Sequence, residues 1–319
     1  MIAITGAGGF IGRHVVRALA GGRCQVRALG RDVGKTKAAL AGVEGVEVVE
    51  GDVTDVESLS AAFRGCEQVI HLVGIILARH GASFEKIHIK GTANVIEAAR
   101  HNRIERMILV SGMGAGPKAR SRYGRSKWQA EEALRSSGLD YAIVRPSVVF
   151  GPDDHFVSDF VRLLGWAPLL VMPGGGRTLL QPVWVEDLAA IIVQLAGRER
   201  LGGIEVAVGG AQALSLKKAV RAIMAAVGRR RPLLGLPFWL ARWVAFLCEA
   251  IMRRPPLTRD QVLMLQEGRF TCDVAPLIEQ FGVDLMSFEK GLEILFHKEK
   301  NQSGGPPAAA GVGRNLQSR

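Results

Sequence analysis

The stretch Met1-Ile-Ala-Ile-Thr-Gly-Ala-Gly-Gly-Phe-Ile-Gly12 decides the fold of this 319-residue chain. Ile2 to Thr5 is rich in β-branched residues and predicts a buried strand, and apolar residues at helical spacing begin at Phe10. The glycines between them predict a tight turn, so the order is strand, glycine-rich turn and helix. A dinucleotide-binding turn requires this order, because the free N–H groups at the start of the helix then face the phosphates.

The glycines of this turn have separate expected roles. Gly6 permits the tight turn, and Gly9 has no side chain to hold off a pyrophosphate. Gly12 lets the helix pack closely on the strand. The remaining members of the predicted phosphate-binding set are Gly8, Phe10 and Ile11. A glycine-rich turn that binds no ligand is the alternative interpretation of the pattern.

Composition indicates either one large α/β domain or a domain with an appended lobe. Apolar residues make up 48% and charged residues 22%, so a sizeable core is available. The four cysteines have no C-x-x-C spacing and the seven histidines have no metal-ligand pattern. We therefore expect neither a disulfide framework nor a metal site. Met1 opens the first strand directly, so we expect no signal peptide or transit segment, and a reducing cytoplasm fits best.

The formal net charge of +11 indicates an anionic partner. Nucleic acid is disfavoured, because the chain has no aromatic-basic interleaving and no reader motif. A phosphorylated cofactor, an acidic substrate and an anionic membrane surface all remain as explanations of the charge.

The second predicted strand, Gln25 to Leu29, ends at the position that distinguishes the two nicotinamide cofactors. Folds that prefer NAD usually place a carboxylate there, which binds the ribose hydroxyls of the adenosine. Here that position falls on Gly30 with Arg31 beside it, which favours the 2′-phosphate of NADP(H). Asp32 follows, and an offset of one residue would restore the acid, so NAD(H) stays an alternative. A solvated turn is the other interpretation of Arg31.

Strands and helices alternate through the next part of the chain, as in a doubly wound parallel sheet. Strands are predicted at 46–50, 68–73, 107–111, 141–149 and 205–208, and helices at 56–63, 87–100, 126–135 and 186–195. Asp52, with Val53 beside it, follows the third strand and is placed to reach the adenine amino group, or else caps the next helix. Val73 and Gly74 are assigned to the cofactor site because they end the fourth strand, at the edge where such sheets bind ligands.

Ser111, Tyr123 and Lys127 form the candidate catalytic set. Tyr123 and Lys127 are four residues apart, which places them on one face of a helix. A phenol with an ordinary pKa of about 10 transfers protons poorly at neutral pH. We expect the adjacent ammonium to favour the phenolate, and Ser111 to hydrogen-bond a substrate carbonyl or alcohol oxygen. These groups are what hydride transfer with coupled proton transfer needs.

The glycine turn together with Ser111, Tyr123 and Lys127 resembles the short-chain dehydrogenase/reductase superfamily, on its extended or atypical branch. Other stretches extend the resemblance, namely Gly51-Asp52-Val53, Arg145 to Pro152 and Pro182 to Asp187. The resemblance implies an NAD(P)-binding Rossmann fold. It also implies that the segment after Arg145, that is Pro146, Ser147 and Val148, contacts the nicotinamide end of the cofactor.

Three more stretches resemble the bacterial relatives of the nucleotide-binding accessory subunit of respiratory complex I: His88 to Ala99, Gly174-Gly-Gly-Arg177 and Leu257-Thr-Arg-Asp-Gln261. This resemblance does not settle a reaction, because the mitochondrial subunit is thought to bind its cofactor without turnover. Two hypotheses follow. The first is an NADP-preferring oxidoreductase or epimerase/dehydratase-like enzyme that acts on a lipophilic or quinone-like carbonyl or alcohol. The second is a cofactor-binding accessory or assembly protein of a membrane redox complex.

The predicted fold class is α/β, a doubly wound Rossmann-type parallel sheet with a small carboxyl-terminal substrate lobe. Residues 1–210 are assigned to the Rossmann domain and 211–298 to a helical substrate lobe, to which an irregular insert at 151–182 contributes. Residues 299–319 are rich in Gly, Pro, Ala and Ser and predict a disordered tail.

Residues 233–252 form a mostly apolar stretch for which we predict a single helix. Arg229 to Arg231 precede it and Arg253-Arg254 follow it. A proline and two charged residues interrupt it, which makes it a poor membrane-spanning segment. Its basic flanks and aromatic residues predict peripheral contact with an anionic membrane, on the inner face, through Phe238, Trp239, Trp243 and Phe246. A lobe helix packed on the core, or an oligomer contact, is the alternative.

Overall fold

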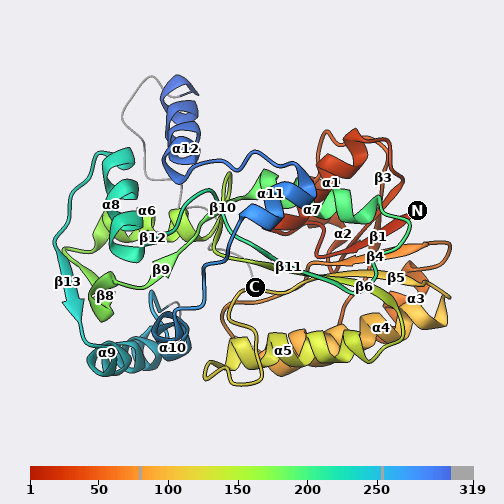
Figure 1. Cartoon of the computed structure of the whole chain (residues 1–319), viewed down its shortest axis with the longest axis horizontal. Coiled ribbons are helices and arrows are strands. Elements are labelled where there is room, and N and C mark those ends of the chain that lie inside the picture. The colour runs from red at the N-terminus through yellow and green to blue at the C-terminus, as the bar shows by residue number, and fades with distance from the viewer. Residues whose placement is uncertain (79–80, 253–254, 303–319) are drawn as a thin grey trace, which may run out of the picture.

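The computed structural model describes residues 1–78, 81–252 and 255–302. A parallel sheet sandwiched between helices forms the larger part of the molecule, and a smaller lobe lies beside it (Figure 1). The α/β prediction is confirmed, with a Rossmann-type sheet and a carboxyl-terminal region. The domain boundary at residue 210 stays a prediction.

Seven parallel strands form the main sheet, in the spatial order β11-β6-β5-β4-β1-β2-β3. The strands are β1 (Ile2–Thr5), β2 (Val26–Gly30), β3 (Val46–Glu50), β4 (Gln68–His71), β5 (Arg106–Val110), β6 (Asp140–Pro146) and β11 (Ile204–Val208). The strand order reverses between β1 and β4, and open α/β sheets bind ligands in the crevice at the carboxyl ends of the strands at such a point.

Both faces of the sheet are covered by helices, as the continuous apolar strands require. One buried cluster joins the sheet to α1 (Phe10–Gly21), α7 (Val185–Ala196) and α11 (Ala275–Phe281). A second cluster lies on the other face, against α3 (Val56–Ala62), α4 (Gly91–His101) and α5 (Arg122–Arg135). The short helix α2 (Val33–Ala39) contacts β2 and β3.

Several predicted boundaries in the core were wrong. The helix expected at 87–100 begins as a π-helical turn, η1 (Glu85–Lys90), which leads into α4. The strand expected at 141–149 divides, and β7 (Val149–Phe150) leaves the main sheet to pair with β10 (Val183–Trp184). Helix α5 begins at Arg122 rather than at residue 126, because the Ser121 side chain accepts a hydrogen bond from Gly124 N–H and caps it. Tyr123 therefore lies in the first turn of α5.

The insert at 151–182 is regular and not irregular as predicted. It contains α6 (Phe156–Trp166), β8 (Leu170–Pro173), a 3-10 turn η2 (Gly174–Gly176) and β9 (Leu179–Leu180), which pairs with β12 (Leu214–Ser215). Helix α6 packs on α8 (Leu216–Val227), and both contribute to a separate apolar core. Apolar residues at helical spacing within the insert carry this packing, for example Val157, Phe160 and Leu164.

The carboxyl-terminal part of the chain completes the lobe with α9 (Phe238–Ile251), α10 (Arg259–Glu267) and α12 (Phe288–Gln302). The single helix predicted at 233–252 was wrong at its start, because β13 (Leu233–Leu236) is a strand parallel to β8. Pro237 separates β13 from α9, since its ring favours a helix start and cannot continue a strand ladder. Residues 299–302 belong to α12 rather than to a tail, and 303–319 lie outside the described residues. Within the described ranges, no helix has both the length and the apolar character needed to cross a membrane.

Candidate functional site

The glycine-rich turn has the geometry that its sequence predicts. Gly6 has a φ of +75°, a conformation that glycine adopts at little cost. A Cβ on Gly12 would overlap the carbonyl oxygen of Gly6, so only glycine lets α1 approach the turn this closely. Gly9 precedes α1 and makes no side-chain capping bond. The first N–H groups of α1, from Phe10 onward, thus meet no capping side chain, which fits a pyrophosphate at this position.

Gly30 is the last residue of β2, and the side chain of Thr36 packs closely against it. A Cβ on Gly30 would overlap the Thr36 hydroxyl, and one on Gly8 would lie 3.4 Å from the same side chain. Helix α2 therefore excludes a carboxylate side chain at position 30. Asp32, the alternative acid, caps α2 by accepting from Lys35 N–H at 2.9 Å, and this bond lowers the pKa of the carboxyl group. Arg31 is exposed beside them, as an arginine that meets a phosphate requires.

Asp52 closes the turn after β3 and does not cap the next helix. Its Oδ1 accepts hydrogen bonds from Thr54 N–H at 2.8 Å and from the Thr54 hydroxyl at 3.0 Å. Asp55 caps α3 instead, so the capping alternative proposed for Asp52 was wrong. Val53 is buried beneath Gly91 of α4. Val73 lies against Gly6, which places the end of β4 next to the glycine turn.

Lys127, Tyr123 and Ser111 come together where β4 and β5 end. Lys127 is buried, and its Nζ donates to the carbonyl oxygen of Val110 at 3.0 Å. A Cβ on Gly74 would lie 3.1 Å from that Nζ, and a Cβ on Gly112 would lie 2.7 Å from the Tyr123 hydroxyl. The Ser111 hydroxyl is buried and has no hydrogen-bond partner among the described residues. An unpartnered buried hydroxyl is suited to bind a polar atom of a ligand.

The protonation states differ from the expectation that Lys127 favours a Tyr123 phenolate. Burial, followed by the negative charge of Glu131, raises the pKa of Tyr123 to about 12. Burial lowers the pKa of Lys127 to about 8, against the opposing effect of Glu131. The Lys127 ammonium hydrogen-bonds the Val110 carbonyl, so the predicted stabilisation of the phenolate by Lys127 was wrong for this structure. At neutral pH Tyr123 is therefore a phenol that can donate a proton.

His88 is a site residue to which the sequence analysis gave no role. Its ring packs edge-on against Tyr123 with centroids 5.6 Å apart, and its Nε2 accepts from Ile75 N–H at 2.9 Å. The Nδ1 atom therefore carries the proton and donates to the Ser126 hydroxyl at 2.8 Å, and that hydroxyl donates to the Tyr123 carbonyl. Burial and then the charge of Lys127 hold the pKa of His88 far below its usual value. A neutral histidine thus fixes the first turn of α5.

Two carboxylates of α10 also hold the start of α5. Asp260 accepts from the N–H groups of Arg122 and Tyr123, at 2.6 and 3.0 Å. Glu267 accepts from Arg120 N–H at 2.5 Å and from the Ser121 hydroxyl at 3.1 Å. Negative charge at a helix N-terminus is favourable, and these bonds join the smaller lobe to the helix that carries Tyr123. Sequence spacing could not reveal this contact, because the partners are more than 130 residues apart.

Ser147 connects the sheet to the smaller lobe. Its hydroxyl donates to the carbonyl oxygen of Phe270 at 2.7 Å and accepts from Gln181 N–H at 3.3 Å. The Ser147 side chain is thus engaged within the protein, and the contact of Pro146, Ser147 and Val148 with the cofactor stays a prediction. Pro146 is buried and Val148 is half-buried, and both lie beside the carboxyl end of β6.

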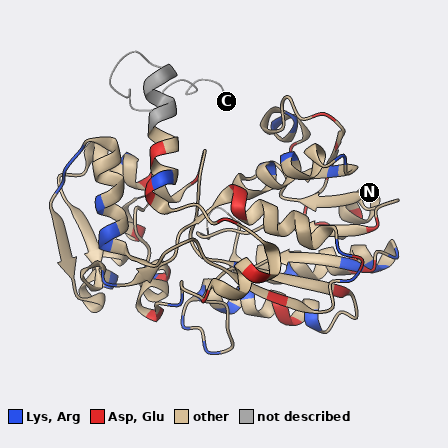
Figure 2. Ribbon diagram, turned by 45° about the horizontal axis from the view of Figure 1, so that its top comes forward, with Lys and Arg blue, Asp and Glu red and all other residues tan. Residues whose placement is uncertain are grey.

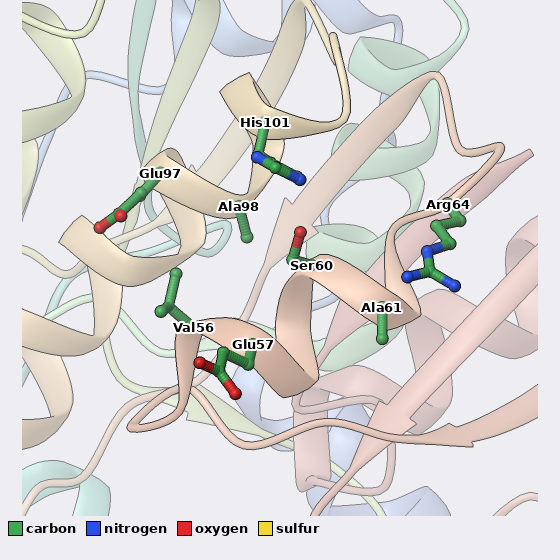
Figure 3. Close-up of a pocket in the computed structure, with 8 residues that line it drawn as sticks. All are labelled: Val56, Glu57, Ser60, Ala61, Arg64, Glu97, Ala98 and His101. Carbon is green, nitrogen blue, oxygen red and sulfur yellow. The ribbon is translucent and has the colours of Figure 1, made fainter.

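A narrow cavity adjoins Tyr123 between the sheet and the lobe. Its volume is about 10 Å³, and its lining combines the apolar Met113, Met264 and Phe270 with the polar or charged Ser121, Glu267 and Arg269. A larger surface hollow of about 330 Å³ lies elsewhere, between α3 and α4 (Figure 3). Charged, polar and small apolar side chains line it, and none of them comes from the carboxyl ends of the strands. We therefore place the site at Tyr123 and not in the larger hollow.

Comparisons with known proteins show which proteins the chain resembles. The family model described as NAD(P)H-binding matches residues 6–155, and that of the RmlD substrate binding domain matches residues 115–224. The chain is 36% identical over 207 residues to ceramide reductase of Caulobacter vibrioides. The matched region makes up 65% of this chain and 64% of that protein. The chain is 27% identical over 297 residues to mouse mitochondrial NADH dehydrogenase [ubiquinone] 1 alpha subcomplex subunit 9, which covers 92% of the chain and 78% of that protein.

Among solved structures, a nucleoside-diphosphate-sugar epimerase from Staphylococcus aureus has a similar fold. The TM-score is 0.76 at 18% sequence identity, over 92% of this chain and 99% of the epimerase. At that identity the likeness establishes the fold alone. It includes the smaller lobe as well as the sheet, because almost the whole of both chains is covered.

Proposed function

Because the chain belongs to the NAD(P)H-binding, extended short-chain dehydrogenase/reductase (epimerase/dehydratase) family, we propose that it is an NADP(H)-dependent reductase that acts on the carbonyl group of a lipophilic substrate. The observation that carries the proposal is the unpartnered Ser111 hydroxyl at the end of β5, next in the chain to Gly112, whose backbone closely approaches the Tyr123 hydroxyl. We propose that the two hydroxyls donate hydrogen bonds to one substrate oxygen.

The cofactor supplies a hydride when bound, and the residues of the chain supply the rest. Ser111 holds the carbonyl oxygen and polarises it. Tyr123 then donates its phenolic proton to that oxygen as negative charge develops there. The raised pKa of about 12 keeps Tyr123 protonated at neutral pH, which favours the reductive direction. Lys127 sits between the ends of β4 and β5 and would hold the ribose of the nicotinamide.

The preference for NADP(H) rests on the end of β2. Thr36 fills the space that an acidic side chain at Gly30 would need, and Asp32 is engaged as the cap of α2. Arg31 is exposed next to both and is available to bind a 2′-phosphate. NAD(H) carries two ribose hydroxyls at this position. Neither Gly30 nor the engaged Asp32 offers a free carboxylate to accept hydrogen bonds from them.

Three apolar side chains next to Tyr123 favour a lipophilic substrate. They are Met113, Met264 and Phe270, and methionine side chains can rearrange to admit a flexible hydrocarbon. The similarity to a ceramide reductase points in the same direction. We propose a long-chain ketone as the substrate class.

The test compares Tyr123→Phe with Tyr141→Phe, which changes the only other tyrosine of the chain. NADPH oxidation is followed with long-chain ketones in detergent micelles, and NADPH affinity is measured by fluorescence. Tyr123→Phe should keep its affinity for NADPH and lose turnover by about 100-fold or more, the scale of general acid catalysis. Tyr141→Phe should match the wild type. Equal rates for wild type and Tyr123→Phe would show that Tyr123 is not the acid.

A second candidate is supported by the similarity to the mitochondrial complex I subunit, which runs through both lobes over 92% of the chain. In that case the dinucleotide would be a structural ligand of an accessory or assembly protein. Tight NADPH binding together with an absence of turnover toward long-chain ketones, quinones and sugar nucleotides would favour this second function.

A further inference from the structure

Helix α9 buries its small side chains and exposes its large apolar ones. Ala241 and Ala245 are fully buried against Val262 of α10. By contrast, Trp239 is 65% exposed, Trp243 62% and Ile251 81%. We define the α9 patch as the exposed apolar side chains of this helix, which are Trp239, Trp243, Phe246, Leu247 and Ile251.

The α9 patch is one continuous face. Its members recur at spacings of three, four and one, which places them together on one side of an α-helix, opposite the two buried alanines. A surface helix of a globular protein usually packs its large apolar side chains against the core. Here the alanines and the half-buried Phe238 pack on the lobe, so the prediction that Phe238 contacts a membrane was wrong. The core-packing alternative does not account for the two exposed tryptophans.

The charges around the α9 patch are predominantly positive. The only acidic side chain of α9, Glu249, pairs with Arg259 of α10 at 2.6 Å, and the same arginine lies 5.1 Å from the centre of the Phe246 ring. Arg242 of α9 is exposed. Two further exposed arginines, Arg229 and Arg230, precede β13 in the blue segment at the edge of the lobe in Figure 2, but they lie at the amino end of that strand and α9 follows its carboxyl end. Arg253 and Arg254, which were also predicted to flank the membrane helix, lie outside the described residues.

We propose that the α9 patch lies on the surface of a bilayer that contains anionic lipid. Tryptophan and phenylalanine are favoured at the boundary between headgroups and acyl chains, and arginines next to them attract anionic headgroups. Helix α9 has 14 residues, and at 1.5 Å each they span about 21 Å, less than the roughly 30 Å of a hydrocarbon core. The helix therefore lies in the plane of the interface. This surface does not depend on the reaction proposed above.

A bilayer fits the patch better than a second copy of the chain does. The exposed Arg242 would repel its counterpart if two such faces met, while Glu249 already pairs with Arg259 within its own chain. A bilayer with anionic lipid offers negative headgroups to the positive charge and acyl chains to the apolar face. The formal charge of +11 would strengthen the attraction at a distance.

The test is co-sedimentation of the full chain with vesicles of phosphatidylcholine alone or with a third of phosphatidylglycerol. The wild type should bind the anionic vesicles at least about ten times more strongly than the neutral ones, and 0.5 M salt should release it. Trp239→Glu with Trp243→Glu should reduce binding at least tenfold. Because both side chains are exposed, the melting temperature and NADPH affinity should stay unchanged. Trp166→Glu is the matched control, since Trp166 is 59% exposed but belongs to α6, outside the α9 patch.

A second measurement uses the wild type and so does not depend on the folding of the double variant. Brominated phosphatidylcholine mixed into the anionic vesicles should quench the tryptophan fluorescence, and a Trp166→Phe variant should be quenched as strongly. Failure of the wild type to bind anionic vesicles, or equal binding by the double variant, would overturn the proposal. A dimer that dissociates on Trp239→Glu with Trp243→Glu, without vesicle binding, would show that the patch is an interface between copies instead.

Discussion

Lys127 serves the proposed cofactor site but lowers the free energy of unfolding. The variant Lys127→Met measures both effects. The side chain is 5% exposed, and burial lowers its pKa from 10.5 to about 8. At about 1.36 kcal/mol per pH unit, charging Lys127 at pH 7 lowers the free energy of unfolding by about 3 kcal/mol. Lys127→Met removes that cost, keeps the length of the side chain and loses the charge-assisted bond to Val110 O, worth about 2 kcal/mol. The free energy of unfolding at pH 7 should therefore rise by about 1 kcal/mol.

The sign of the pH dependence follows from the lowered pKa. Between about pH 8 and pH 10.5 the unfolded chain holds a proton on Lys127 that the folded chain has released, so the free energy of unfolding of the wild type rises with pH in this window. The difference in free energy of unfolding between Lys127→Met and the wild type should thus be largest below pH 8 and decrease above it.

Urea unfolding of the cofactor-free proteins at pH 7 and pH 10 measures both effects. Lys290→Met, at an exposed position of α12, is the control and should show no such change. Lys127→Met should also bind NADPH more weakly and lose turnover, since the lysine would hold the ribose. A variant that is less stable than the wild type at pH 7, or whose advantage does not shrink with pH, would refute the argument from burial.

Three further substitutions test neighbouring parts of the site. Arg31→Ala should weaken NADPH binding by about ten- to a hundredfold in a fluorescence titration and leave NADH unchanged, because one charge-assisted bond to phosphate is lost; equal losses for both cofactors would contradict the assignment. Ser111→Ala should lower kcat at least about tenfold with NADPH affinity intact, whereas an unchanged kcat would remove Ser111 from the site. Asp260→Ala should lower kcat several-fold and the melting temperature by a few degrees, with NADPH affinity kept, since it frees the N–H groups of Arg122 and Tyr123. A loss of NADPH affinity as large as the loss of kcat would argue against this positioning role.

The sheet was predictable because its signals are local. Short β-branched runs that end in glycine or an acidic turn mark strands, and helical periodicity marks the segments between them. Long-range contacts decided the features that the sequence did not reveal. Residues 233–236 became a strand because β8 offers its backbone as a partner, and the insert at 151–182 became regular because α6 could pack on α8.

The site was predictable in its residues but not in its electrostatics. Ser111, Tyr123 and Lys127 do come together, because the carboxyl ends of parallel strands share one edge of the sheet. Spacing along a helix cannot tell how deeply a side chain is buried. The pKa of Tyr123 is therefore raised where adjacency to Lys127 predicted that it would be lowered. The role of His88 was equally hidden, since it depends on a π-helical turn that no periodicity signalled.

The contacts of α10 explain the structural role of the stretch Leu257 to Gln261. Thr258 and Gln261 form a capping box that fixes the first turn of α10. That turn presents two neighbouring charges to different partners: Arg259 binds Glu249 of α9, and Asp260 binds the backbone of Tyr123. One helical turn thus connects the exposed α9 patch to the helix that carries Tyr123.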